Sequence, residues 1–382
     1  SPPPAYASRQ DRIQPQVESL ERMDVLAEGH PVQSEAGEML RKRPVCRIAS
    51  TIRQPTKPRK LPMRLLFLVQ KEQRIILDRL YEAVAANCQC DLRWLDKSQQ
   101  ANLRTYFKQN IDIDAYDRII FFLRFKQEIR QYGFIRSLPN LVILEHDAYQ
   151  NFIPCKYTGK FSRHYRRLPG CRVLTSGAAV TRKLKEEGFD AVFVPKGYDQ
   201  ALLHDLKLSR DIELAFVGSL NSVAYSGRRE LLEQLAKEEP LVVTRTKSGE
   251  DYLNTLNRIR FFVSADVGMG EYMIKNFEAM ACGCILLAYR QGEGEEEALG
   301  FSDMNNIVLY SSIAELREKL AQLRANPERA EQIARAGQDL VTTRYTFEAI
   351  GKIIVEETSR PLALRPPLNL MEKLRSRFCW IP

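Results

Sequence analysis

The sequence lacks the features of a membrane-spanning or secreted protein. It contains no apolar run of the roughly 18 to 20 residues that a transmembrane helix needs. Its first ten residues, SPPPAYASRQ, lack the apolar core of a signal peptide. Its eight cysteines are scattered and never form the paired C-x2-C spacing of a zinc site. We therefore expect a cytoplasmic protein with reduced thiols and no bound metal.

Four widespread catalytic motifs are also missing. The chain has no G-x-G-x-x-G after a first strand, no G-x-x-x-x-G-K-[ST], no H-E-x-x-H and no G-x-S-x-G. These motifs carry dinucleotide binding, P-loop phosphate binding, zinc proteolysis and serine hydrolysis. None of these four chemistries is therefore supported by the sequence.

Charge is present, but it is unevenly distributed. The net charge is +9, and the segment from Arg41 to Arg64 alone holds nine Lys or Arg residues and no acid. A solvated linker is the simplest interpretation of such a run. Peripheral contact with an anionic membrane at the inner face of the cell, or with another polyanion, is the alternative. Nucleic acid is not expected, because the segment has no interleaved aromatics and matches no nucleic-acid motif.

The order of the apolar runs predicts two α/β domains. At 382 residues, the chain is too long for a single hydrophobic core. Short buried-strand runs alternate with helical patterns, which is typical of a parallel, doubly wound sheet, and the pattern restarts near residue 205. The expected strands are 64–69, 91–96, 117–123, 141–147, 171–176 and 191–195, then 213–219, 240–245, 260–266 and 284–289.

These runs define four parts. We expect a basic, Pro-containing extension over 1–61, a first domain over 62–205, a second domain over 206–357, and a tail over 358–382 that crosses back to the first domain. Two such domains would face a central cleft formed by the carboxyl ends of their strands. Ligands of open α/β sheets bind at these ends.

The first candidate anion site is the segment FVGSLNSVAYSGRRELLEQL. The predicted strand ends at Gly218, Ser219 follows in a loop, and a helix opens near Ser226 with Arg228 in its first turn. Free backbone amides, the positive helix end and a guanidinium together suit a diphosphate. An ordinary strand-to-helix turn with a surface arginine is the alternative.

The second candidate anion site is the segment VGMGEYMIKNFEAMACGC. A glycine loop follows a predicted strand and leads into a helix, whose first amides and Lys275 would attract an anion. One turn further on, Glu278 can accept hydrogen bonds from two vicinal hydroxyls, as on a ribose. The alternative is that this carboxylate only interacts with the helix dipole. The residues assigned to this site are Tyr272, Met273, Ile274, Lys275, Asn276 and Glu278.

These motifs resemble a known family. KNFEAMACGCILLA, the stretch from NNIVLY to GQDLV, and RYTFEAI are similar to the carboxyl-terminal domain of group 1 nucleotide-sugar glycosyltransferases of GT-B fold. The likeness covers about residues 171–356 and is strongest to the branch of spore-maturation-protein-like glycosyltransferases. It implies a GT-B fold with two Rossmann-like domains, and it implies that Glu278 binds the donor ribose. It also places the nucleotide base near Arg245 and Thr246, with uracil and guanine both open.

The sequence departs from this family at one position. The family's E-x7-E motif would place its first glutamate, which contacts the donor sugar, at Gly270. Glu271 lies one place away and is the candidate to replace it. Retention and inversion of the sugar's configuration therefore both stay open.

The candidates for acceptor-side chemistry lie in the first domain. His146 and Asp147, in LEHDAY, follow a predicted strand and offer a general base for an inverting transfer. A polar strand-to-loop transition is the alternative. His164 lies in the basic segment GKFSRHYRRLPG, which predicts a solvated loop, with contact to a charged acceptor as the second possibility.

The sequence thus predicts a glycosyltransferase that moves a sugar from a nucleoside diphosphate sugar to a hydroxyl. The acceptor would be a glycan, a lipid-linked molecule or a protein, in glycan, cell-envelope or protein glycosylation. No cofactor is expected beyond the nucleotide-sugar co-substrate, and no metal is expected because cations and helix ends would neutralise the diphosphate. The alternatives are a non-catalytic nucleotide-binding or scaffold module and, more weakly, a sugar-nucleotide epimerase.

Overall fold

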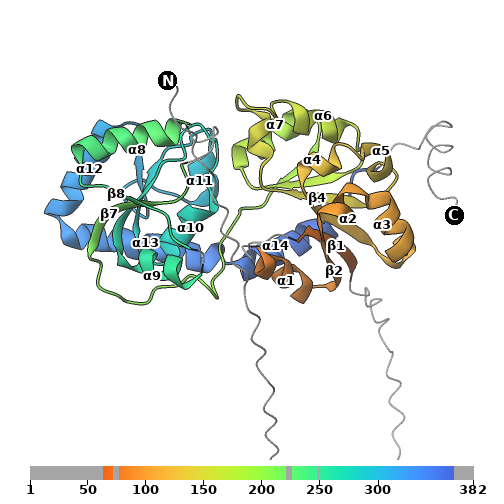
Figure 1. The fold of residues 1–382 in the computed structure, drawn as a ribbon, viewed down its shortest axis with the longest axis horizontal. Coiled ribbons are helices and arrows are strands. Elements are labelled where there is room, and N and C mark those ends of the chain that lie inside the picture. The colour runs from red at the N-terminus through yellow and green to blue at the C-terminus, as the bar shows by residue number, and fades with distance from the viewer. Residues whose placement is uncertain (1–62, 72–76, 221–225, 248, 365–382) are drawn as a thin grey trace, which may run out of the picture. The chain divides into compact units, whose positions relative to one another are not determined.

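A computed structural model describes residues 63–71, 77–220, 226–247 and 249–364 (Figure 1). The chain divides into two units, residues 1–59 and 60–382. The first unit lies outside the described residues, and so do nearly all of the predicted basic segment and the tail beyond residue 364. The second unit contains two sheets.

The first sheet has six parallel strands in the order β2-β1-β3-β4-β5-β6. The inner strands β1, β3 and β4 are nearly continuous buried apolar runs, as expected for a sheet covered on both faces, whereas the edge strand β2 is partly polar and half-buried. All six runs that predicted strands in this domain form them. The strands are β1 (Arg64–Gln70), β2 (Gln89–Leu95), β3 (Arg118–Phe122), β4 (Leu141–Glu145), β5 (Arg172–Thr175) and β6 (Asp190–Phe193).

Helices and short turns connect these strands. The longer helices α1 and α7 each place a stripe of apolar residues against the sheet. The elements are α1 (Asp78–Ala86), α2 (Lys97–Ala101), α3 (Leu103–Asn110), η1 (Ile113–Ala115), α4 (Phe125–Glu128), α5 (Tyr132–Ile135), η2 (Ala148–Asn151), α6 (Lys160–Arg166) and α7 (Ala178–Glu186).

The second sheet has five parallel strands in the order β11-β10-β9-β7-β8. Four of them were predicted, and the three-residue β11 was not, because so short a run gives no clear pattern. The strands are β7 (Ile212–Val217), β8 (Val242–Thr244), β9 (Ile259–Ser264), β10 (Ile285–Tyr289) and β11 (Val308–Tyr310). The α/β class with two doubly wound sheets is therefore confirmed.

We call the parts of the chain built around the first and the second sheet the first and the second lobe. The helices of the second lobe begin at residues that the local sequence favours. Ser312 accepts a hydrogen bond from the Glu315 amide at 3.2 Å, and Asn326 accepts one from the Arg329 amide at 3.0 Å with Pro327 in the first turn. The Glu315 carboxylate bonds to the amide of Ser311 and so closes the cap one residue earlier than in a standard capping box. The helices are α8 (Ser226–Glu238), α9 (Glu250–Arg258), α10 (Ile274–Ala281), α11 (Glu295–Leu299), α12 (Ile313–Ala325), α13 (Pro327–Arg344) and α14 (Phe347–Ser359).

Helix α14 returns to the first lobe. It lies within the range predicted for the second domain, but it packs on α1, where a Cβ on Gly351 would lie 2.8 Å from the backbone of Ala83. Arg172 of β5 then donates to the carbonyls of Glu357 at 2.7 Å and Pro361 at 2.8 Å. The chain therefore crosses between the lobes a second time just before α14.

Candidate functional site

The second sheet has a topological switch point between β7 and β9. From β7 the chain continues to the outer strand β8, whereas from β9 it continues in the opposite direction to β10. Connections that leave neighbouring strands in opposite directions open a crevice at their carboxyl ends, where ligands bind. Gly218 and Ser219 follow β7, Ala265 and Asp266 follow β9, and α10 starts shortly after. Both predicted anion-binding segments therefore come to one edge.

Glu278 lies in α10 with 8% of its surface exposed. The hydroxyl of Tyr252, from α9, donates a hydrogen bond to Glu278 Oε2 at 2.6 Å. Burial raises the pKa of Glu278, while Tyr252 and the nearby Lys275 act in the opposite direction. The carboxylate is thus held in one orientation by a tyrosine that sequence reasoning missed, because a lone Tyr in an amphipathic helix carries no motif.

Lys275 reaches the end of β7. Its Nζ donates to the carbonyl of Val217 at 2.7 Å, and a Cβ on Gly218 would lie only 2.8 Å from that nitrogen. A glycine at this position therefore makes room for the ammonium group. Burial lowers the pKa of Lys275, the nearby Glu278 acts in the opposite direction, and the positive charges of Arg228 and Arg245 lower the pKa further. Three cations from three different connections thus converge on this edge.

Arg228 is partly committed to a protein partner. Its Nη2 lies 2.5 Å from Asp266 Oδ1, and both side chains are less than a tenth exposed. Asp266 also accepts from Asn276 Nδ2 at 2.9 Å. Arg228 was predicted to bind a diphosphate, with an ordinary surface arginine as the alternative, and it lies in a buried ion pair. Asp266, which no sequence motif marks, orients both Arg228 and Asn276.

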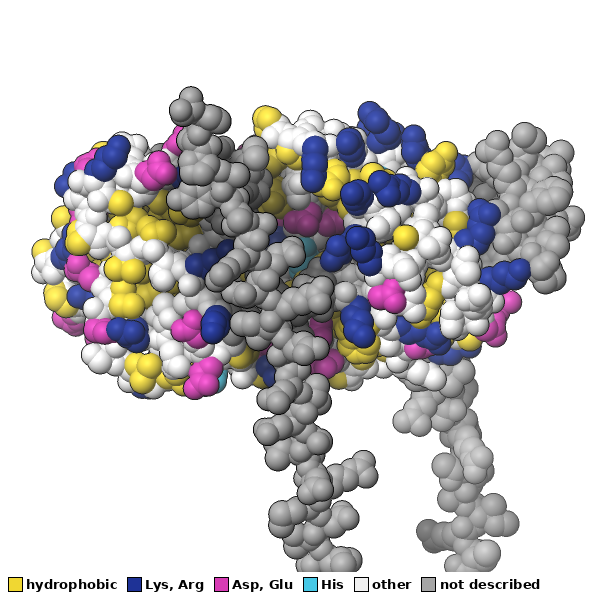
Figure 2. All heavy atoms as spheres, in the orientation of Figure 1, with side chains coloured by type: hydrophobic (Ala, Val, Ile, Leu, Met, Phe, Trp, Pro, Cys, Tyr) yellow, Lys and Arg dark blue, Asp and Glu magenta, His cyan; other side chains and the backbone are white. Residues whose placement is uncertain are grey.

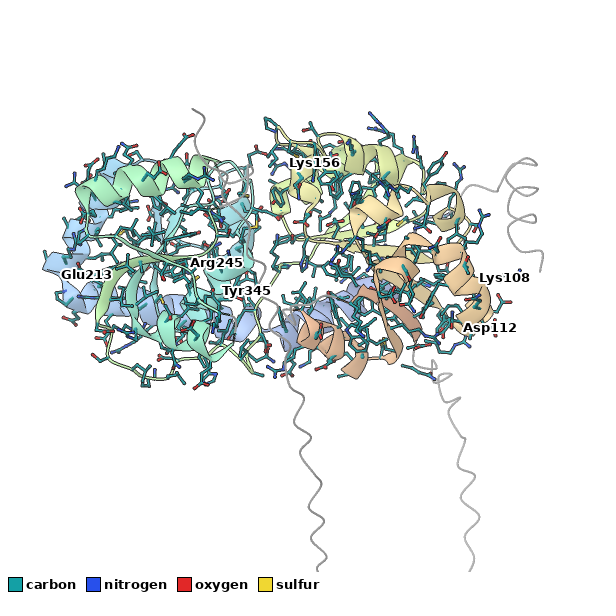
Figure 3. The ribbon with its side chains drawn as sticks, viewed as in Figure 1. Lys108, Asp112, Lys156, Glu213, Arg245 and Tyr345 are labelled. Atoms are coloured by element: carbon teal, nitrogen blue, oxygen red, sulfur yellow. The ribbon has the colours of Figure 1, made fainter. Side chains whose placement is uncertain are left out.

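The other residues predicted to bind the donor differ in whether their backbone amides or their side chains can reach a ligand. Met273 caps α10 with an extended backbone, and Ile274 is the first helical residue, so their amides belong to the helix start. Arg245 and Thr246 follow β8, and Arg245 is exposed (Figure 3). The Tyr272 hydroxyl instead donates to Glu296 at 2.7 Å inside the core, so only its backbone can face a ligand.

Asp147 and His146 follow β4 at the carboxyl edge of the first sheet. The Asp147 amide donates to Glu145 Oε1 at 2.8 Å. Asp147 is exposed, but partial burial of its carboxyl group raises the pKa, while the positive charge of Lys196 acts in the opposite direction. Burial lowers the pKa of His146 to about 3, and its ring packs edge-on against Phe122 with centroids 5.1 Å apart. Asp147 is therefore the better placed base, since a group must be accessible to take an acceptor proton.

Glu271 occupies a different environment from the one predicted. It is 1% exposed and forms an ion pair with Lys196, which follows β6. The hydroxyl of Ser176 lies 3.3 Å from Glu271 Oε2, and Gly177 leaves the space that this carboxylate fills. The carboxylate is therefore already satisfied by protein partners. Lys196 was missed, and its only sequence signal is a lysine inside the turn VPKGYD.

A second buried carboxylate contacts the first lobe. Glu295, at the start of α11, accepts from the amides of Ala178 at 2.7 Å and Ala179 at 3.1 Å, which open α7. Burial raises the pKa of Glu295 to about 7, and the nearby Glu271 raises it further, whereas the two amides lower it. Both carboxylates are thus fixed at the edge that carries Asp147.

His164 corrects the prediction of a solvated loop. It lies in α6, is 2% exposed, and its Nε2 is 3.4 Å from Glu128 Oε2. The solvated-loop interpretation was wrong because the cations of GKFSRHYRRLPG occupy one face of a helix whose other face is apolar.

Within the described ranges, no group of three or more His, Cys, Asp or Glu side chains is arranged to hold a metal ion. Among the helices that the structure describes, none combines the length and the apolar character needed to cross a membrane.

Comparison with known proteins supports the interpretation of the second lobe. Residues 196–356 match a family model described as glycosyl transferase-like. No curated protein matches the sequence significantly.

The fold of the chain resembles the folds of solved structures at low sequence identity. HepE from Anabaena, in complex with UDP and glucose, is 14% identical, with 78% of this chain and 100% of that chain covered and a TM-score of 0.58. Sucrose-phosphate synthase from Thermosynechococcus elongatus is 12% identical, with 77% and 98% covered and a TM-score of 0.56. A glycosyltransferase from Rickettsia africae is 12% identical, with 78% and 97% covered and a TM-score of 0.56. The chain thus has the GT-B fold, and its second lobe carries a glycosyl transferase-like domain.

Proposed function

We propose that the protein is a glycosyltransferase that takes its sugar from a nucleoside diphosphate sugar and passes it to an acceptor hydroxyl. The observation that carries this proposal is the pairing of a buried, oriented carboxylate with a lysine at the switch point of the second sheet. Glu278, held by Tyr252, suits a ribose diol, and Lys275 suits the diphosphate. The family match over residues 196–356 supports the same assignment.

We propose uridine as the nucleoside. HepE has been solved with UDP and with UDP-glucose, and its fold is shared by this chain. The finer kinship to spore-maturation-protein-like glycosyltransferases also stays our proposal, supported by the KNFEAMACGCILLA motif. So does an active site without an obligatory metal, in which Lys275, Arg245 and the first amides of α10 offset the charge of the diphosphate.

The proposed reaction is a single displacement. The acceptor oxygen forms a bond to the anomeric carbon while the bond from that carbon to the diphosphate oxygen breaks. The acceptor proton passes to Asp147, and the nucleoside diphosphate leaves with the bonding electrons. The cations beside Val217 and Gly218 stabilise the charge that develops on the leaving group.

The decisive experiment is incubation with a panel of UDP-, GDP- and ADP-sugars, followed by measurement of free nucleoside diphosphate. We expect release from at least one UDP-sugar, and we expect Glu278→Gln to reduce it. Release from none of the sugars, with or without added glycan acceptors, would contradict the proposal. A parallel assay in EDTA tests metal independence, because activity should then be retained.

One observation favours a second candidate function, a nucleotide-binding module without catalysis. Glu271, the candidate to contact the donor sugar, is instead buried against Lys196. A protein that binds UDP tightly but turns over no UDP-sugar would match this second function.

A further inference from the structure

The first lobe carries an unusual excess of positive charge around its candidate base. Between Arg124 and Lys185 the sequence holds thirteen Lys or Arg residues and only three acids, Glu128, Glu145 and Asp147. Glu128 is 1% exposed and Glu145 is 7% exposed. Asp147 is therefore the only acid in this stretch that is exposed.

Eight of these cations form what we call the basic surface. Their side chains are exposed, and within the described ranges only Arg166 pairs with a carboxylate, that of Glu187 at 2.7 Å. The basic surface consists of Arg124, Lys126, Arg130, Lys156, Lys160, Arg163, Arg166 and Arg167.

Aromatic packing brings these cations to one part of the lobe. Phe125 of α4 stacks on Phe161 of α6 with ring centroids 3.7 Å apart, and Tyr157 packs edge-on against Phe125 at 5.6 Å. Lys156 in turn lies over the ring of Tyr157 at 5.0 Å. The helices α4 and α6 and the segment between η2 and α6 are thus joined. Figure 2 shows Lys and Arg side chains gathered over this part of the molecule.

The basic surface begins at the candidate base. Strands β3 and β4 are neighbours, and Arg124 follows the end of β3 as Asp147 follows the end of β4. From Asp147 the chain continues into η2, where Asn151 Nδ2 donates to the Ser162 hydroxyl of α6 at 2.7 Å. An acceptor that places a hydroxyl at Asp147 therefore extends over positive charge.

We propose that the acceptor is a soluble polyanion, a molecule with several phosphate or carboxylate groups that bind along the basic surface while one hydroxyl reaches Asp147. This inference rests on the proposed glycosyl transfer and specifies its acceptor. Exposed cations over an extended surface match a chain of anions, because each contact releases condensed counterions.

The lack of apolar anchors favours a soluble polyanion over a membrane. Membrane-binding surfaces combine cations with apolar side chains that enter the lipid. Among the described residues, the large hydrophobic side chain exposed at this surface is Tyr132, and Arg167 lies over its ring at 4.4 Å. The surface thus offers charge without an inserting patch.

The test is binding of short-chain inorganic polyphosphate to the full chain, by calorimetry at several salt concentrations. Saturating UDP is present so that the diphosphate site is filled. The triple variant Lys156→Ala/Lys160→Ala/Arg163→Ala should bind polyphosphate about 10- to 100-fold more weakly and reduce the salt slope by about two to three units. The matched control, Lys97→Ala/Arg104→Ala/Lys108→Ala, removes equal charge from exposed positions on α2 and α3 of the same lobe. Figure 3 shows Lys108 well away from Lys156.

The outcomes separate this inference from the proposed function. Equal losses in the two triple variants, or no polyphosphate binding by the parent protein, would overturn the polyanion inference. Release of UDP from UDP-sugars is measured apart and can succeed in either case. A second experiment measures binding to vesicles of phosphatidylcholine with phosphatidylglycerol. Binding to these vesicles without binding to polyphosphate would overturn the polyanion inference in favour of a membrane. Tighter binding of polyphosphate than of vesicles, weakened in Lys156→Ala/Lys160→Ala/Arg163→Ala and not in the control variant, supports the polyanion inference.

Discussion

Lys196 and Glu271 form a buried ion pair between the segment after β6 and the loop after β9. Both side chains are less than a tenth exposed, and Ser176 adds a hydroxyl that contacts the lysine at 2.8 Å. Removing one partner of such a pair leaves an uncompensated charge away from water. That loss is costlier than the pair's net contribution to stability.

Lys196→Met should therefore lower the free energy of unfolding by about 3 to 5 kcal/mol. Urea denaturation measures the loss. Lys207→Met is the control, since its pair with Asp205 leaves the lysine 79% exposed and should contribute little. The double variant Lys196→Met/Glu271→Leu should recover most of the stability. If the two lysine variants were equally stable, the structural role of Lys196 would be refuted.

Glu278→Gln should weaken UDP binding by about 1 to 3 kcal/mol, because a neutral amide is a poorer acceptor for ribose hydroxyls. Tyr252→Phe removes the hydroxyl that orients this carboxylate and should cost less. Calorimetry with UDP compares the three proteins. An unchanged affinity in Glu278→Gln would remove this residue from the ribose site.

Lys275→Ala should weaken UDP binding more than uridine binding, because the ammonium group is proposed to meet phosphate oxygens. Titration with both ligands gives the difference, and equal losses would argue against a phosphate contact.

Arg228→Ala should likewise weaken UDP binding more than uridine binding. It should also lower the free energy of unfolding by about 3 to 5 kcal/mol, since Asp266 would be left buried without its cation. Thermal unfolding in the absence of ligand measures the added effect. A fully stable Arg228→Ala protein would mean that the ion pair with Asp266 contributes nothing to the fold.

Asp147→Asn should lower kcat by roughly 100- to 10,000-fold while leaving UDP affinity nearly unchanged. The raised pKa of Asp147 sets the pH dependence. A base works when ionised, so activity should fall as the pH decreases through this raised pKa, above the range of an ordinary aspartate. The pKa of His146 is lowered to about 3, so this side chain stays neutral over the pH range in which activity falls. His146→Gln should therefore leave the midpoint of the acid side of the pH–activity profile unchanged. A loss below about tenfold for Asp147→Asn would reassign the base.

Glu295→Gln should change how stability depends on pH. The pKa of Glu295 is raised to about 7 in the folded protein, whereas it is about 4.3 in the unfolded chain. Its contribution to stability is therefore complete below about pH 4.3 and is lost as the pH rises through about 7. The wild type should therefore lose about 1 to 3 kcal/mol more than the variant between pH 5 and pH 8. Urea unfolding at both values measures the difference, and parallel losses would contradict it.

Strands and cap positions were predictable because their signals are local. The apolar runs before Gly218 and Asp147 mark the strand ends, and a strand end in a doubly wound sheet lies at the ligand edge. Ser312 and Asn326 are likewise residue types that favour helix N-caps, and both cap the helices that follow them.

The partners of the site residues were not predictable, since they depend on contacts between segments far apart in sequence. Tyr252 reaches Glu278 across 26 positions and Arg228 reaches Asp266 across 38, and neither spacing is a motif. The chain also gives no local sign that Glu271 is neutralised by Lys196. Long-range charge pairing is settled by tertiary packing, which a pattern of residue types does not encode.

The two places where the chain passes between the lobes are bound to each other. Tyr198 donates its amide to the carbonyl of Tyr345 at 2.9 Å, and the amide of Phe347 donates to the carbonyl of Tyr198 at 2.8 Å. Gly197, with φ of 68°, leaves no room for a side chain against Tyr345. The two crossings therefore form one hydrogen-bonded, two-stranded connection between the lobes. A Cβ at Gly197 would lie 2.6 Å from the carbonyl oxygen of Tyr345, so Gly197→Ala would push the two crossings apart and strain the hydrogen bonds that join them.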